Sequence, residues 1–426
     1  MPTEAWLTRA AAAHPGRKAV GSMEYAELLR QAQSAARRIA AMGAAPGEPV
    51  ALVLPPGQEF ALAFHGCLLL GCPAVPVDPS RSEAERGELT RGCEVIVDGP
   101  LEGHEDPAAR PRSRFEPDEI AVVMHTSGST GAPAPVELTY RNLWWSAAGS
   151  AVALGLDPEE RWLCCLPVAH VGGLSILVRS AIYATTAIVH ERFDTDAVLA
   201  VLTGEEGPTM VSLVPTMLGR LLDAGLERPP ALRHALLGGA PAPDGLLARA
   251  QRAGVPVAPT WGMTEAASQV TTFGRPLFCT TVGVTEAGEL MVDGPTVSPS
   301  CERPLATGDL GRIEPGGEVV VTGRASATII TGGENVQPAL VEEAVESHPA
   351  VLECGVYGRP DPEWGEAVVA VIVLREGAEV DAAELGKWCR ERLAPFECPK
   401  EFRFAGSLPR TGAGKIDRTK MGESDG

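Results

Sequence analysis

Short apolar runs alternate with segments of helical spacing along most of the chain. Residues 50–54 and 74–77 are continuous apolar runs, typical of buried parallel strands, and residues 59–70 between them have the spacing of a helix. The alternation continues through further predicted strands at 162–166, 187–190, 210–214 and 234–237. This pattern predicts an α/β fold of mostly parallel sheets covered by helices.

The pattern changes after about residue 282. Short strands at 288–292 and 317–322 are separated by Gly/Pro turns, which is typical of a small β-barrel-like element. Beyond this element, two helices and two strands predict a compact α+β unit, at 338–347, 382–393, 351–356 and 367–374. We therefore predict a large N-terminal domain, residues 1–325, and a small C-terminal domain, residues 326–426.

Composition narrows the classes of function. A formal net charge of −19 argues against nucleic-acid binding through a broad basic surface. The N-terminus lacks the pattern of a signal peptide, and the longest apolar stretch, residues 60–77, is interrupted by His65 and Pro73, so we expect no membrane insertion. Ten cysteines without a Cys-x-x-Cys pair predict reduced thiols and no structural zinc. We expect a cytoplasmic protein.

A loop rich in glycine and hydroxyl side chains follows the predicted strand at residues 120–124. Residues 125–131 read His-Thr-Ser-Gly-Ser-Thr-Gly and contain no lysine or arginine. Glycines let a backbone approach a ligand closely, and hydroxyls and free N–H groups can surround phosphate oxygens. It is not a Walker loop, because Ala132 and Pro133 follow the last glycine. The residues predict either a phosphate-binding loop or an ordinary turn.

Two more segments of the large domain carry groups suited to a nucleotide. Residues 236–241, Leu-Leu-Gly-Gly-Ala-Pro, turn at the carboxyl end of a predicted strand, where ligands bind in open α/β sheets. Residues 260–265 place Glu265 near Trp261, and a carboxylate can hold a Mg²⁺ ion that also binds phosphate. The structural alternatives are an ordinary βα turn and a first-turn helix glutamate without a ligand.

Polar segments nearer the C-terminus add two further candidates. Asp309, with Arg324 fifteen residues on, offers acceptor and donor groups suited to a ribose diol. Lys415 follows a Gly-Ala-Gly arm, and its ammonium can neutralise charge that develops between a carboxylate and a phosphate. The structural alternatives are ordinary turn residues for Asp309 and Arg324, and a solvent-exposed lysine without a ligand for Lys415.

The ordered combination of these segments resembles the adenylate-forming superfamily, which includes acyl-CoA synthetases, peptide-synthetase adenylation domains and luciferases. The match runs nearly end to end, through the segments 126–131, 261–265, 307–309, 323–324, 332–335 and 409–415. Within the superfamily the chain is most similar to the o-succinylbenzoate–CoA ligases of menaquinone biosynthesis. That narrower resemblance is carried by residues 166–175, 236–243 and 262–270.

The resemblance implies an ATP-dependent, AMP-forming acid–thiol ligase that makes an acyl-AMP and transfers the acyl group to coenzyme A. It implies that nucleotide is bound by Thr126, Ser127, Gly128, Ser129, Thr130, Gly131, Gly239, Ala240, Pro241, Trp261, Gly262, Thr264, Asp309 and Arg324. It implies catalytic roles for Lys415, His170 and Glu265, with Mg²⁺ on Glu265. We expect the carboxylic acid to be bound by His170, Ser212, Gly239, Thr260 and Gln269. A hydrogen-bonded histidine at a strand end is the alternative for His170.

The chain departs from the usual pattern of the superfamily at three places. Ala134 stands where a lysine is usual, and Pro135 replaces a glycine. Ser326 occupies the hinge, where Asp or Lys is usual, although serine also occurs in the o-succinylbenzoate group. The segment 294–307 is much shorter than is typical. The resemblance implies that the small C-terminal domain is a mobile lid, which pivots near Ser326 between the two half-reactions.

Three alternative functions stay open from the sequence. The chain can be a ligase for another acid, such as a benzoate or a medium-chain acid. It can be a catalytically weakened adenylate-binding homologue, which only Ala134 favours, or an adenylation module that loads a carrier protein, although no carrier serine motif follows Lys415. We expect only small-molecule partners, namely the acid, ATP and coenzyme A, and a homodimer is one alternative for the assembly.

Overall fold

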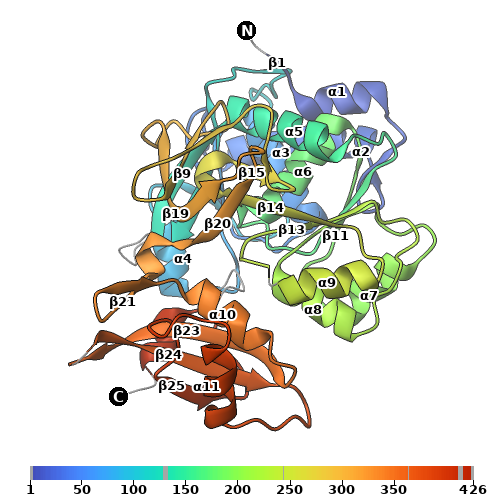
Figure 1. Ribbon diagram of the computed structural model, residues 1–426. Helices are drawn as coiled ribbons and strands as arrows, with labels where there is room; N and C mark the ends of the chain where they lie inside the picture. Colours follow the sequence, from blue (N-terminus) through green and yellow to red (C-terminus); the bar gives the residue numbers. More distant parts are fainter. Residues whose placement is uncertain (1–2, 128–132, 243, 363, 411–415, 424–426) are drawn as a thin grey trace. The chain divides into compact units, whose positions relative to one another are not determined.

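The computed structural model (Figure 1) describes residues 3–127, 133–242, 244–362, 364–410 and 416–423. By its internal contacts the chain divides into two compact units. The first unit comprises Met1–Gly239, Ala250–Thr281 and Val292–Leu305. The second comprises Ala240–Arg249, Val282–Met291 and Ala306–Gly426. The predicted domain boundary near Ser326 falls within the second of these units. The division into domains 1–325 and 326–426 stays a prediction.

A nine-stranded sheet dominates the first unit. Its strands lie in the order β16 (Arg275–Pro276), β15 (Ser268–Thr272), β14 (Val257–Met263), β13 (His234–Leu237), β12 (Met210–Leu213), β10 (Arg161–Cys164), β11 (Thr186–Val189), β2 (Lys18–Val20) and β3 (Met23–Glu24). Neighbours from β14 to β2 are parallel, whereas the pairs at either end are antiparallel. All four residues of β12 are buried, as expected of a strand covered on both faces. The predicted parallel strands are confirmed.

A second sheet of the first unit carries the residues before and after the predicted phosphate loop. Its strands lie in the order β6 (Val95–Val97), β4 (Val50–Leu52), β5 (Ala74–Pro76), β8 (Ile120–Ser127) and β9 (Pro133–Thr139). All neighbouring strands are parallel except β8 and β9, which form an antiparallel pair. A short antiparallel pair, β1 (Thr3–Glu4) and β7 (Arg114–Phe115), completes the unit.

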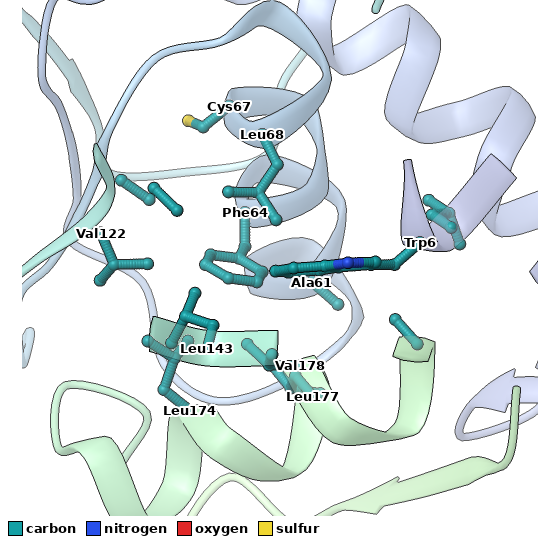
Figure 2. Packing of buried hydrophobic residues seen from close by; sticks show 14 of the residues in the cluster. Trp6, Ala61, Phe64, Cys67, Leu68, Val122, Leu143, Leu174, Leu177 and Val178 are labelled. Carbon is teal, nitrogen blue, oxygen red and sulfur yellow. The ribbon is translucent and has the colours of Figure 1, made fainter. Parts of the chain in front are cut away.

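Helices join the two large sheets through one hydrophobic core. The helices before residue 253 are α1 (Trp6–Ala13), α2 (Tyr25–Ala41), α3 (Gln58–Leu70), α4 (Glu83–Leu89), α5 (Tyr140–Leu154), α6 (Val171–Tyr183), α7 (Thr195–Thr203), α8 (Pro215–Asp223) and α9 (Asp244–Arg252). Helix α3 is apolar all round and buried from Phe60 to Leu70. Figure 2 shows Phe64 of α3 beside Leu143 of α5, with Leu174 of α6 nearby. The core includes residues of both sheets and of α1, α2, α3, α5 and α6, so these helices hold the two sheets together.

The second unit contains two smaller sheets. The first is the antiparallel sheet β17 (Thr281–Val284), β18 (Glu289–Asp293), β19 (Leu305–Ile313) and β20 (Val319–Arg324), which confirms the predicted barrel-like element. The other has the order β22 (Glu334–Val336), β21 (Ile329–Thr331), β24 (Gly365–Leu374) and β23 (Val351–Asp361), and β25 (Glu401–Phe404) pairs with β24. Its helices are α10 (Pro338–Glu346), α11 (Ala382–Arg390) and α12 (Arg418–Glu423). Within the ranges that the structure describes, no helix is both long and apolar enough to cross a membrane.

Helix α10 carries a glutamate with an unusual ionisation. Burial raises the pKa of Glu346 to about 7, and the neighbouring carboxylates Glu342 and Glu353 act in the same direction. The backbone N–H of Cys354 donates a hydrogen bond to Glu346 at 2.9 Å, which opposes the rise only in part. Glu346 is therefore half-protonated near neutral pH in the folded chain.

Replacing Glu346 with glutamine tests this ionisation. The unfolded chain ionises Glu346 near pH 4.5 and the folded chain near pH 7, so wild-type stability falls as the pH rises through this window. Glu346→Gln should therefore stabilise the folded chain more at pH 8 than at pH 4.5. We expect the change that it causes in the free energy of unfolding to differ by about 1 to 3 kcal/mol between the two pH values. Urea unfolding at both pH values measures the difference, with the exposed Glu379→Gln as control. An equal effect at the two pH values contradicts the prediction.

Candidate active site

Four neighbouring parallel strands end at one edge of the nine-stranded sheet. The order β14, β13, β12 and β10 places their carboxyl ends side by side, and Ser212 of β12 pairs in register with Leu236 of β13. Ligands of open α/β sheets bind at this kind of edge. The predicted site residues of the first unit lie at or just beyond it, namely His170, Ser212, Gly239, Thr260, Trp261, Gly262, Thr264, Glu265 and Gln269.

Two glycines shape the turn after β13. A Cβ atom on Gly238 would lie 2.8 Å from the Thr260 methyl group, so the backbone of the turn packs directly against β14. Gly239 has a φ of +83°, a left-handed conformation that favours glycine. Gly239, Ala240 and Pro241 are exposed, and their role in binding nucleotide stays a prediction.

The motif at residues 261–265 ends one strand of a hairpin. Strand β14 pairs with β15, and the register shifts between Trp261 and Gly262. A Cβ atom on Gly262 would lie 1.8 Å from the carbonyl oxygen of Ser268, so only glycine fits there. Thr264 and Glu265 then form a 3₁₀ turn, Thr264–Ala266, rather than the start of an α-helix. The Thr260 hydroxyl donates to the Thr271 carbonyl at 2.7 Å and is thus used within the hairpin.

Glu265 has the chemistry of a Mg²⁺ ligand. Its side chain is half-buried, and within the described ranges its carboxylate forms no hydrogen bond or ion pair. Mg²⁺ prefers carboxylate and phosphate oxygens and retains part of its water shell. No cluster of three or more His, Cys, Asp or Glu side chains able to hold a metal occurs among the residues described. Glu265 therefore fits a cation that a bound phosphate also ligates.

His170 lies at the N-terminus of α6. Its backbone carbonyl accepts the N–H of Leu174 at 3.0 Å, and its imidazole is half-exposed. A Cβ atom on Gly173 would lie 2.4 Å from the Pro167 carbonyl oxygen, so the turn before His170 packs tightly on the first turn of the helix. This packing fixes His170 near the end of β10, while its catalytic role stays a prediction.

Ser212 and Gln269 are buried residues near the edge of the nine-stranded sheet at which the parallel strands end. Ser212 is 5% exposed, and its hydroxyl accepts a hydrogen bond from the indole N–H of Trp162 at 3.0 Å. Gln269 is 2% exposed, and its amide donates to the Thr272 hydroxyl at 2.8 Å. The Gln269 carbonyl oxygen has no hydrogen-bond partner in the described part of the chain. Both positions suit the floor of an acyl pocket, and this role stays a prediction.

Arg179 of α6 was not predicted, and it is the most unusual charged residue of the first unit. It is 1% exposed, and its guanidinium donates to the Ser146 hydroxyl at 3.2 Å and lies 5.5 Å from the Trp162 ring centroid. Among the described residues it has no carboxylate partner, and its Nε is unpaired. Burial lowers the pKa of Arg179 below its usual range. The signal in the sequence was a single charge within the otherwise apolar segment Val171–Tyr183.

The predicted ribose pair lies in the second unit. Asp309 of β19 faces Arg324 of β20 in register, and Arg324 Nε lies 2.8 Å from a carboxylate oxygen of Asp309. Gly308, with a φ of +70°, makes the turn between Thr307 and Asp309, and the Thr307 hydroxyl accepts the N–H of Asp309 at 3.1 Å. The structure thus brings Asp309 and Arg324 together as the sequence predicts. Ser326 lies exposed in the 3₁₀ turn Ala325–Ala327.

Several predicted residues, Gly128, Ser129, Thr130, Gly131 and Lys415, lie outside the described residues. Thr126 and Ser127 end strand β8, and Thr126 pairs with Ala134 of β9. The residues beside Lys415 are anchored: Arg410 forms an isolated bridge with Ile416 and pairs with Glu353 at 2.8 Å. Arg418 pairs with Glu342 at 2.6 Å.

Known proteins resemble this chain over nearly its whole length. It matches the family model of the AMP-binding enzyme over residues 7–97 and 83–336, and that of the AMP-binding enzyme C-terminal domain over residues 340–415. The 2-succinylbenzoate–CoA ligase of Bacillus licheniformis is 35% identical over 474 residues, which cover 98% of each chain. The enzyme of that name from Bacillus subtilis is 35% identical over 473 residues, 98% of this chain and 97% of the relative.

Solved structures agree with these relatives. The o-succinylbenzoate coenzyme A synthetase of Bacillus subtilis in complex with ATP and magnesium ion has a TM-score of 0.91 at 33% identity, over 99% of each chain. The same enzyme with the acyl-adenylate intermediate OSB-AMP has a TM-score of 0.90 at 33% identity, over 99% of this chain and 98% of that one. This chain belongs to the AMP-binding enzyme family.

Proposed function

We propose that the chain joins o-succinylbenzoate to coenzyme A with ATP, as an AMP-forming acid–thiol ligase of menaquinone biosynthesis. The observation that carries the proposal is the gathering of the predicted nucleotide and acyl residues at the carboxyl ends of β10, β12, β13 and β14. The names of the relatives support the same activity. The substrates of the reaction are small molecules only.

In the first half-reaction, a carboxylate oxygen of the acid attacks the α-phosphorus of ATP, and the bond to pyrophosphate breaks to leave an acyl-AMP. Trp261 and residues 239–241 hold the adenine, and Asp309 accepts hydrogen bonds from the ribose hydroxyls. Glu265 holds Mg²⁺, which offsets phosphate charge when bound. Lys415 donates to the oxygens on which negative charge develops, so that positioning and electrostatics supply most of the rate.

In the second half-reaction, the thiol of coenzyme A attacks the acyl carbonyl, loses its proton, and displaces AMP. We assign residues 332–335 to this step and Ser326 to the pivot that exchanges them with Lys415. The chemistry supports two separate arrangements, because the phosphate charge that Lys415 offsets leaves with pyrophosphate before the thiol reacts. His170 lies beside the acyl carbonyl or the path of the thiol in this proposal.

Arg179 supports a substrate with two carboxylates. o-Succinylbenzoate is activated at its succinyl carboxylate, so its ring carboxylate stays negative and needs a positive partner when it is buried. Arg179 supplies a buried positive charge that lacks a carboxylate partner among the described residues. Its guanidinium lies over the ring of Trp162, whose indole N–H donates to Ser212, so one side chain links Arg179 to a residue of the predicted acyl pocket. We propose that Arg179 binds the ring carboxylate.

A panel of acids tests the proposed substrate. Thioester formation with ATP and coenzyme A is measured for o-succinylbenzoate, 4-oxo-4-phenylbutanoate, benzoate and octanoate. The proposal expects the highest kcat/KM for o-succinylbenzoate, because only this acid supplies both the succinyl chain and the ring carboxylate. A higher kcat/KM for benzoate or octanoate would overturn the assignment of o-succinylbenzoate as the substrate, but not the class of ligase.

Ala134 predicts weaker handling of ATP than in relatives that carry a lysine there. Ala134 is exposed on β9 opposite Thr126, at the end of the strand that follows the proposed phosphate loop. A lysine there would add a charge-assisted donor for phosphate oxygens. We expect Ala134→Lys to lower the KM for ATP about two- to fivefold, the value of one exposed charge-assisted contact. Val152→Lys, on an exposed face of α5, controls for added charge. An unchanged KM means that another residue already fills this role.

We propose a cytoplasmic location for the reaction. All ten cysteines are free thiols in the structure, which agrees with a reducing compartment. The homodimer stays a prediction, and light scattering of the purified chain tests it.

A further inference from the structure

A short segment of the first unit joins the strand after the predicted phosphate loop to the turn that carries Glu265. The backbone N–H of Ser298 donates to the carbonyl of Glu265 at 2.8 Å. The hydroxyl of Ser298 donates to the carbonyl of Glu137, in β9, at 2.6 Å. One residue therefore contacts both elements through two different groups.

Ser300 completes the attachment to β9. Strand β9 is at the edge of its sheet, so the backbone groups of Glu137 that face outward have no neighbouring strand. The Ser300 hydroxyl accepts the N–H of Glu137 at 3.3 Å and lies 2.6 Å from the Ser298 hydroxyl. The two serines, which we call the serine bridge, thus satisfy both the N–H and the C=O of Glu137. They take the place of a neighbouring strand.

The serine bridge is held in place by the packing around it. Ser298 is fully buried, at 0% exposure, so its hydrogen bonds are shielded from competing water. Asn142, at the start of α5, donates to the carbonyls of Pro295 and Val297 at 2.9 and 3.0 Å. The segment therefore has a fixed path between β9 and Glu265.

We propose that the serine bridge is a positioning device that sets the spacing between β9 and Glu265 for Mg²⁺-bound triphosphate. The inference rests on the proposed function, because it takes the residues between β8 and β9 as the phosphate loop and Glu265 as the ligand of the cation. A triphosphate with its cation must meet both elements at once. AMP has no β- and γ-phosphates and does not depend on their spacing.

Nucleotide binding to Ser298→Ala tests the bridge without measuring turnover. The variant keeps the N–H bond to Glu265 but loses the hydroxyl bond to β9. We expect the Kd of Mg·ATP, measured by calorimetry, to rise about three- to tenfold, and the Kd of AMP to change less than about twofold. Ser300→Ala, at an exposed position, should also raise the Kd of Mg·ATP, but by a smaller factor.

Thr296→Val provides a matched control from the same segment. Thr296 is also at 0% exposure, but its hydroxyl has no hydrogen-bond partner in the described part of the chain, so both Kd values should stay unchanged. If Ser298→Ala raises the Kd of Mg·ATP and the Kd of AMP equally, or raises neither, the proposal is wrong. Failure of the nucleotide site on which this inference rests is distinguishable, because the unaltered chain would then bind neither nucleotide. A different acid substrate would leave both Kd values of the unaltered chain intact.

Discussion

Lys415→Ala lowers the rate of acyl-adenylate formation by about 100- to 1000-fold and leaves the conversion of supplied acyl-AMP to thioester within about twofold of the wild type. This is the largest effect that the proposed mechanism predicts. The ammonium offsets charge only while pyrophosphate departs, so its removal affects the first transition state and not the second. Pyrophosphate release measures the first half-reaction, and thioester formation from synthetic acyl-AMP measures the second.

The matched control is Lys387→Ala on the exposed face of α11, which should leave both half-reactions unchanged. It removes a lysine from the same unit without touching the segment between Arg410 and Arg418. If Lys415→Ala slows both half-reactions equally, the assignment of Lys415 to the first step alone is wrong. The proposed exchange of Lys415 with residues 332–335 between the two half-reactions would then also be wrong.

Arg179→Gln raises the KM for o-succinylbenzoate by about 10- to 100-fold, the value of one or two hydrogen bonds to a charged group. The same change should leave the KM for 4-oxo-4-phenylbutanoate nearly unaltered, because that acid lacks the ring carboxylate. The preference for o-succinylbenzoate over the second acid therefore collapses. Steady-state kinetics with both acids measures the ratio of their kcat/KM values.

Arg179→Lys is the matched variant for charge. It keeps a positive group in the same helix and should retain most of the preference, although it loses the fixed geometry of the guanidinium. A purely structural role for Arg179, through its contacts with Ser146 and Trp162, would weaken the use of both acids alike. Equal losses with the two acids would thus contradict the assignment of the ring carboxylate to Arg179.

Local patterns predicted the parallel strands well, because buried strands such as β4, β5 and β12 are continuous apolar runs. Strand β9 was missed for a physical reason. It begins Pro-Ala-Pro, and proline lacks the N–H that a central strand needs. The edge position of β9 tolerates Pro133 and Pro135, but this position depends on sheet order, which local sequence does not reveal.

The site was predictable where chemistry and backbone freedom coincide in sequence. Gly262 was visible within its motif, and the structure gives the reason for glycine there in its contact with Ser268. The contacts between distant segments were not predictable. Arg179 meets Ser146, 33 residues away, and Ser298 meets Glu137, 161 residues away. Such pairs are set by how α5, α6 and β9 pack, and a short sequence window contains no trace of them.

Product analysis in two stages tests the central claim most directly. The purified chain is mixed with o-succinylbenzoate, ATP and Mg²⁺, and coenzyme A is added only after the first products have been identified by mass spectrometry. The account predicts pyrophosphate and the acyl-AMP of o-succinylbenzoate in the first stage, then AMP and the coenzyme A thioester in the second. Formation of ADP and phosphate, or a thioester without any acyl-AMP before it, would contradict the account.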